Sequence, residues 1–213
     1  DLPLIREAAR TGRPMIISTG MADRQEIREA IDTARAAGCE QLAVLQCTSS
    51  YPAPPSASNL RTIPDLRNWT GVEVGLSDHT LGIGTAVAAV ALGATLIEKH
   101  VTISRSDGAV DSAFSLEPDD LASLVLETQR AWESLGTVDY GPNEADANSL
   151  AHRRSLFFDR DLPAQAVLSE GDVRSARPND GLAPRYAELL LGRTLNTAVR
   201  RGDPVTWEHL QNP

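Results

Sequence analysis

The chain has 213 residues, of which 41% are hydrophobic, and a formal net charge of −9. This length is sufficient for one substantial core and a small second domain. No apolar run approaches the roughly 20 residues that a membrane-spanning helix needs, and the chain does not open on a signal-type segment, which predicts a cytoplasmic protein. The negative charge argues against nucleic acid or an anionic membrane as the main partner. Cys39 and Cys47 lack metal-type spacing and fit a reducing compartment.

The first 140 residues alternate between short apolar runs and helix-type segments. Residues 4–9 have the pattern of part of a helix. Pro118 is typical of the first turn of a helix and Gly136 of its end, so a further helix is predicted between them. Alternation of this kind predicts a parallel β/α sheet, either open or closed into a barrel. The predicted strands cover residues 14–18, 42–46, 72–76 and 95–97, and the predicted helices cover residues 23–38, 60–66, 84–92 and 118–135.

A different pattern follows a polar linker at residues 141–150. Short strand-type runs and turns predict a compact β-rich module over residues 151–213, close to the lower size limit for independent stability. We expect it to lean on the first domain or on another subunit. Its predicted strands cover residues 155–158, 167–168, 173–176, 193–195 and 204–206.

Two histidines follow predicted strands of the first domain. His79 and His100 come three residues after the ends of the third and fourth apolar runs, and the carboxyl ends of neighbouring parallel strands lie on one face. Two neutral imidazoles can bind one divalent metal. Asp78 is a candidate to orient an imidazole. Because side chains alternate along a strand, Glu98 is expected to point inward with His100, and Lys99, the single lysine, outward into a structural ion pair.

Four motifs follow one another along the chain: Ser18-Thr19-Gly20-Met21, the segment 47–52, Leu76-Ser77-Asp78-His79-Thr80 and Ile97-Glu98-Lys99-His100. In this order they resemble the sialic acid synthase family, whose members condense phosphoenolpyruvate with an amino-sugar aldehyde to a nine-carbon α-keto acid. The segment 153–207 is similar to the antifreeze-protein-like (SAF, β-clip) domain that ends these enzymes. The segment 111–118 looks most like the pseudaminic acid synthases, which act on a 2,4-diacetamido-2,4,6-trideoxy-hexose.

The resemblance implies an α/β fold: the C-terminal half of a (β/α)8 TIM barrel at residues 1–140, a linker at 141–150, and a β-rich SAF domain at 151–213. The first four barrel strands, which in the family bring a metal-side glutamate and two lysines that bind phosphoenolpyruvate, are not in this sequence. We therefore expect a fragment of a transferase that is inactive alone, and a domain-swapped homodimer for the full-length enzyme.

The resemblance also implies roles for individual residues. The metal ligands and catalytic residues would be His79 and His100, holding Mn²⁺ or, as alternatives, Mg²⁺ or Co²⁺. Asp111 would be both catalytic and substrate-binding, with Asp107 as the less favoured neighbour. The remaining substrate-binding residues implied by the family are Ser18, Ser49, Tyr51, Ser77 and Arg177, of which Arg177 would reach the sugar in the neighbouring subunit.

Three other functions stay open at this stage. The enzyme could be an N-acetylneuraminate or legionaminate synthase, or a different barrel aldolase. A Schiff-base aldolase would need an inward lysine, and the single lysine is expected to point outward. The chain could also be a non-catalytic fragment or sugar-binding module, although residues 155–207 lack the flat threonine-rich repeat that ice binding favours.

Overall fold

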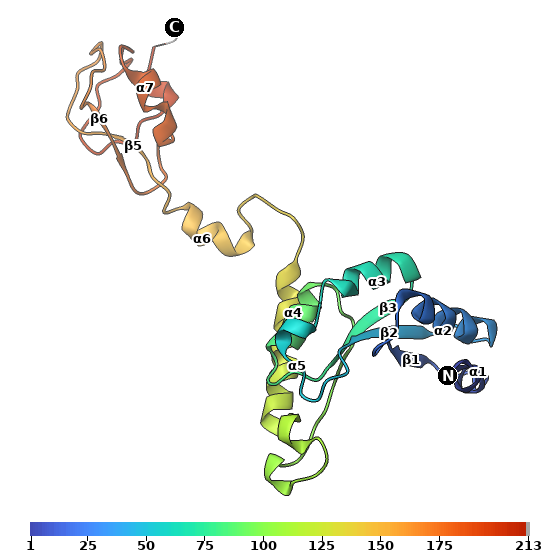
Figure 1. Ribbon diagram of the computed structural model, residues 1–213. Helices are drawn as coiled ribbons and strands as arrows, with labels where there is room; N and C mark the ends of the chain where they lie inside the picture. Colours follow the sequence, from blue (N-terminus) through green and yellow to red (C-terminus); the bar gives the residue numbers. More distant parts are fainter. Residues whose placement is uncertain (212–213) are drawn as a thin grey trace. The chain divides into compact units, whose positions relative to one another are not determined.

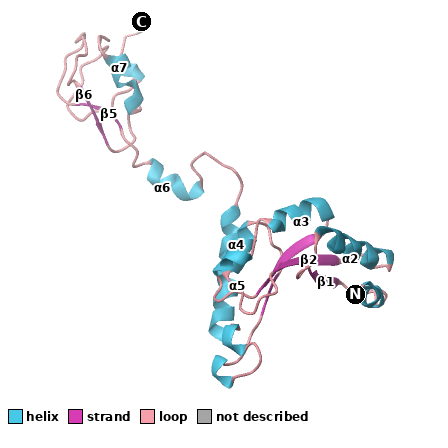
Figure 2. Ribbon diagram, in the orientation of Figure 1, coloured by secondary structure: helices cyan, strands magenta, loops and turns pink. Residues whose placement is uncertain are grey.

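A computed structural model describes residues 1–211 of the chain. The chain divides into two compact units after Thr137, and each unit is described by itself. Figures 1 and 2 show the helices and strands of each.

The first unit is built on a parallel sheet of four strands in the order β1-β2-β3-β4. Every neighbouring pair is parallel, and the helices between the strands provide the crossovers (Figure 2). This arrangement confirms the predicted half barrel with an α/β fold. The strands are β1 (Met15–Ser18), β2 (Leu42–Cys47), β3 (Glu73–Asp78) and β4 (Ile97–Lys99).

The helices of the first unit begin and end where local chemistry favours it. A capping box between Asp23 and Glu26 opens α2, and left-handed Gly71 ends α3. The predicted helix at 60–66 is shifted toward the C-terminus, because Ile63 and Leu66 bury against β3. The helices are α1 (Leu2–Ala9), α2 (Arg24–Ala36), α3 (Thr62–Thr70), α4 (Gly84–Ala91) and α5 (Pro118–Leu135).

The helices cover one face of the sheet. In β3, Val74 and Leu76 are buried in a cluster with residues of α3 and α4. The alternate residues of a strand point to the opposite face, which in this unit has no helical layer of its own among the described residues, and Ile16 there is 58% exposed. That second face carries Ser18, Ser77 and Glu98 near the carboxyl ends of the strands.

The second unit has a small apolar core centred on Phe158, Leu190 and Leu195, all fully buried. It contains an antiparallel pair of strands, and the predicted strands at 167–168, 193–195 and 204–206 occur only as isolated bridges, since these runs are too short to form ladders. The predicted linker includes a short helix with a 3₁₀ turn before it, capped by Asn143. The elements are α6 (Ala147–Leu150), β5 (Ser155–Phe158), β6 (Val173–Ala176) and α7 (Ala187–Leu190).

Candidate functional site

Two imidazoles meet at the carboxyl ends of β3 and β4. The register pairs Asp78 with Lys99, so the next residues, His79 and His100, leave the sheet side by side. Their ring centres are 5.3 Å apart. His79 is buried, whereas the side chain of His100 is 35% exposed. The structure therefore brings the predicted pair together at the end of the sheet where barrel enzymes place their active sites.

The orientation of His79 is set by a backbone carbonyl. Its Nδ1 lies 2.9 Å from the carbonyl oxygen of Thr48, in the loop after β2. A carbonyl oxygen can only accept, so Nδ1 is the donor in this contact, and in the neutral ring Nε2 has the lone pair. The prediction that Asp78 orients an imidazole is wrong, because the Asp78 carboxylate faces the helices and pairs with Lys99 at 2.8 Å.

An aromatic cluster surrounds the two imidazoles. The ring of Tyr51 lies 4.1 Å from that of His79 and 5.9 Å from that of His100, measured between centres. Phe114 packs edge-on against His100 at 5.3 Å. Tyr51 is 53% exposed, so it forms the outer wall of this cluster, while Phe114 is buried and forms its base. Phe114 had no role in the sequence prediction, since a lone phenylalanine in a polar loop carries no signal of where it packs.

Asp111 approaches the same cluster from the loop after β4. Its Oδ2 lies 3.8 Å from Nδ1 of His100, too far for a hydrogen bond, so the two side chains are neighbours without a direct bond. Its backbone is left-handed, with φ of 67°, which an aspartate adopts at a cost of about 1 kcal/mol and which recurs at functional sites. Asp107 instead belongs to a 3₁₀ turn and has no contact with either histidine among the described residues.

Arg105 holds the loop that carries Asp111. Its Nε donates to the carbonyl oxygen of Ser115 at 2.9 Å, and its guanidinium pairs with Glu117 and Asp120 at the start of α5. The hydrogen bond from the Glu117 backbone, together with Arg105, lowers the pKa of the Asp120 carboxyl. No sequence signal singled out Arg105, because arginine supplies nearly all the basic residues of the chain.

The two imidazoles are compatible with a shared divalent cation. An imidazole nitrogen binds such a cation at about 2.0–2.1 Å, which puts two ring centres on one cation at most roughly 6.4 Å apart, and the observed separation is 5.3 Å. The Thr48 contact is also the type of outer contact that metal-binding histidines make. Among residues 1–211, however, no three His, Cys, Asp or Glu side chains are grouped so that they could hold a metal.

The predicted serines lie at the carboxyl end of the sheet, and Arg177 lies in the second unit. Ser77 is buried and donates to Oε1 of Glu98 at 2.7 Å, which leaves its hydroxyl no second proton to donate. Ser18 is the exposed last residue of β1, and the exposed Ser49 lies beside Gly20, so both are at the same end of the sheet. Arg177 follows β6 in the second unit and is exposed.

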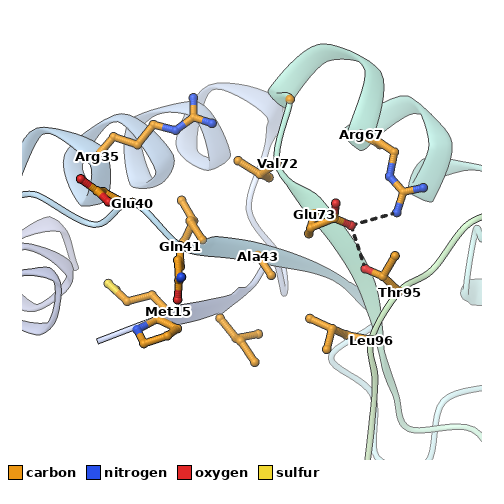
Figure 3. Close-up of a pocket in the computed structure, with 14 residues that line it drawn as sticks. Met15, Arg35, Glu40, Gln41, Ala43, Arg67, Val72, Glu73, Thr95 and Leu96 are labelled. Atoms are coloured by element: carbon orange, nitrogen blue, oxygen red, sulfur yellow. Dashed lines mark hydrogen bonds and ion pairs between the residues drawn. The ribbon is translucent and has the colours of Figure 1, made fainter. Parts of the chain in front are cut away.

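A cavity of the first unit lies at the other end of the sheet. It measures about 870 Å³ and is lined by residues at the amino ends of the strands, including Met15, Gln41, Glu73 and Thr95 (Figure 3). Thr95 and Arg67 both contact Glu73 there. Because barrel enzymes carry their chemistry at the carboxyl ends, we do not place the site in this cavity.

Over residues 1–211, no helix combines the length and the apolar character that crossing a bilayer requires.

Comparison with known proteins identifies both parts of the chain. Residues 1–140 match the NeuB family and residues 153–211 match the SAF domain. The chain is 36% identical to N,N'-diacetyllegionaminic acid synthase of Legionella pneumophila and 35% identical to pseudaminic acid synthase of Campylobacter jejuni, over 99% and 95% of its length. It spans 61% and 59% of the length of these two relatives.

A solved structure agrees with this assignment. The N-acetylneuraminic acid synthetase of Leptospira borgpetersenii, determined with citrate, matches 70% of this chain and 52% of its own, with 35% identity and a TM-score of 0.64. The NeuB match covers well over half of the residues, and the relatives cover nearly all of them. The chain therefore belongs to the NeuB family and carries a SAF domain.

Proposed function

We propose that this chain is part of a nonulosonic acid synthase that condenses phosphoenolpyruvate with a 2,4-diacetamido-2,4,6-trideoxy-hexose aldehyde and releases phosphate. The observation that carries the proposal is the convergence of His79, His100, Tyr51 and Asp111 at the carboxyl ends of the strands. Membership of the NeuB family and the names of the relatives support it.

In this proposal C3 of phosphoenolpyruvate attacks the aldehyde carbon, water adds at C2, and phosphate leaves. A divalent cation, with Mn²⁺ favoured over Mg²⁺ or Co²⁺, would supply electrophilic assistance when bound. Nε2 of His79 and a ring nitrogen of His100 would hold it. Water, substrate or segments of the complete protein would provide the remaining ligands, since these two imidazoles do not complete a coordination sphere.

The other side chains would bind and orient the substrates. The Asp111 carboxylate would accept hydrogen bonds from sugar hydroxyls, and the exposed face of Tyr51 would close the outer side of the sugar. Ser18 and Ser49 would donate to phosphate or carboxylate oxygens. Ser77 would join them only after releasing Glu98, because its proton is already donated.

A legionaminate or N-acetylneuraminate synthase is the alternative. It is favoured by the identity of 36% to the Legionella legionaminic acid synthase, which is no lower than the 35% to the Campylobacter pseudaminic acid synthase. The pseudaminic assignment rests on the loop that carries Asp111. A non-catalytic sugar-binding module is disfavoured by the buried, oriented His79.

Assembly and organisation are part of the same proposal. We propose a barrel part at residues 1–140, a linker at 141–150 and a SAF domain at 151–213. The complete protein would be a cytoplasmic homodimer in which Arg177 of one subunit reaches the sugar in the other. Guanidinium suits this role because it donates to an amide carbonyl in a fixed geometry.

The test uses the complete product of the source gene. Phosphate release from phosphoenolpyruvate is measured with Mn²⁺ and each candidate aldose, and activity with the diacetamido-trideoxy sugar is expected. His79→Ala should abolish metal retention and turnover, whereas His152→Ala, at an exposed histidine of the second unit, should change neither. Activity with N-acetylmannosamine alone would refute the substrate, and an unaffected His79→Ala variant would refute the site.

A further inference from the structure

Two other side-chain pairs precede the histidine pair along β3 and β4. In register, Ser77 lies opposite Glu98 and Asp78 opposite Lys99. The first pair is joined by a hydrogen bond of 2.7 Å and the second by an ion pair of 2.8 Å. Side chains alternate along a strand, so Ser77 and Glu98 share a face with the histidines, whereas the ion pair lies on the helix-covered face.

Lys99 contacts the chain on both sides of His79. Its Nζ lies 2.8 Å from Oδ2 of Asp78, the residue before His79, and 2.5 Å from the carbonyl oxygen of Thr80, the residue after it. Oδ1 of Asp78 in turn accepts from the backbone nitrogen of Thr80 at 2.9 Å. Lys99 is itself the neighbour of His100 in the sequence. One ammonium group therefore ties the backbone around the first histidine to the residue next to the second.

Stability alone does not account for this ion pair. Its two side chains are 3% and 1% exposed, so both charges have lost their hydration. A buried pair of this type contributes little stability compared with apolar residues of similar size. The pair instead fixes the geometry between the two strands, because Nζ donates to the Asp78 carboxylate and to the Thr80 carbonyl oxygen at the same time. The β3 and β4 backbones are then held in one relative position where hydrogen bonding between the strands ends.

We propose that Lys99 is a positioning residue that sets the spacing of His79 and His100 so that both imidazoles bind the same divalent cation. This inference rests on the proposed metal site and assigns the distance between the imidazoles to the Lys99 ammonium. Without that ammonium, the segment around His79 would keep its contacts with the loop after β2 but lose its side-chain tie to β4. The two imidazoles would then no longer be held at one spacing, and a cation would bind one imidazole at a time.

Cu²⁺ is a suitable probe because it has the highest affinity among divalent first-row metals for nitrogen ligands. Electron spin echo modulation counts the imidazoles on each Cu²⁺, and titration gives the affinity, so no turnover is needed. With the full chain we expect two imidazoles per Cu²⁺ at the tight site. His79→Ala and His100→Ala should each reduce the count to one.

The informative variant is Asp78→Asn combined with Lys99→Met, which removes both charges and leaves none buried alone. We expect this double variant to fold, to bind Cu²⁺ through a single imidazole, and to lose affinity by roughly 10- to 100-fold, the usual effect of losing an outer contact. Ile31→Ala is the matched control. It opens the buried core beside β2 and lowers stability without touching the ion pair, so its Cu²⁺ should keep two imidazoles.

Two results separate this inference from the proposed function. If the unaltered chain never shows two imidazoles on one Cu²⁺, the metal site itself is refuted. If the unaltered chain shows two and the folded double variant still shows two at the same affinity, the metal site stands and the positioning role of Lys99 is refuted.

Discussion

The buried carboxylate of Asp172 is predicted to anchor the second unit. It stands directly before β6 and is 1% exposed. Its Oδ2 accepts from the backbone nitrogen of Ser169 at 2.8 Å and from the Ser169 hydroxyl at 2.9 Å, and its Oδ1 accepts from Nε of Arg160 at 2.5 Å. Asp172→Ala would remove all three bonds and leave the three donors without this acceptor.

The expected loss is a large part of the stability of the unit. A hydrogen bond to a charged group contributes about 1.5–3 kcal/mol, whereas a whole small domain is stable by only about 5–15 kcal/mol. We expect the bonds from Ser169 to account for most of the stability lost, because the Arg160 side chain is 61% exposed and water screens its charge. Arg160→Ala should therefore cost clearly less than Asp172→Ala.

Protonating the Asp172 carboxylate at low pH should also lower the stability of the second unit. The hydrogen bond from Arg160, reinforced by those from Ser169, lowers the pKa of Asp172 below the ordinary 3.8. A carboxyl whose pKa is lower in the folded state stabilises the fold above its unfolded pKa, and this stability disappears as the pH falls through the folded pKa. The unit should thus weaken below about pH 4, and Asp172→Asn should remove that part of the pH dependence.

The assay is urea unfolding followed through Trp207, which lies in the second unit, with Trp69 and Trp132 of the first unit replaced by phenylalanine. Glu170→Ala, at an exposed neighbouring carboxylate, is the control and should change little. A cost of less than about 1 kcal/mol for Asp172→Ala, no more than one ordinary hydrogen bond, would exclude the Asp172 carboxylate as an anchor of the second unit. Equal loss of stability on acidification by Asp172→Asn and by the unaltered chain would exclude the Asp172 carboxyl as the source of the pH dependence.

Three further predictions concern the first unit. Lys99→Met should cost about 3–5 kcal/mol, because Asp78 is left charged and buried, and adding Asp78→Asn should restore most of it in urea unfolding; equal stability of both variants would contradict this. Gly75→Ala should lower the thermal midpoint, since its methyl group would lie 2.7 Å from Cβ of Leu96 and overpacking costs about 1–3 kcal/mol; an unchanged midpoint would contradict the close strand packing. Arg105→Met should speed amide hydrogen exchange across residues 101–115, and unchanged exchange there would exclude Arg105 as the residue that holds this loop.

Much of the architecture follows from local patterns. The capping box of α2, Pro118 at the start of α5 and Gly136 after its end are signals read within a few residues. The alternation of apolar runs and helices correctly predicted a parallel sheet, and the outward direction of Lys99 followed from the side-chain alternation of a strand. The strands of the second unit were less predictable, because isolated bridges depend on partners distant in the sequence.

The sequence by itself determined which residues stand at the strand ends, because His79 and His100 each come three residues after an apolar run of strand character. Only the tertiary structure decided what these residues contact. The carbonyl that orients His79 lies 31 positions earlier in the chain, and the lysine that pairs with Asp78 lies 21 positions later. Such contacts depend on the register between strands, which arises from packing the helices over the sheet and is not encoded in any short segment.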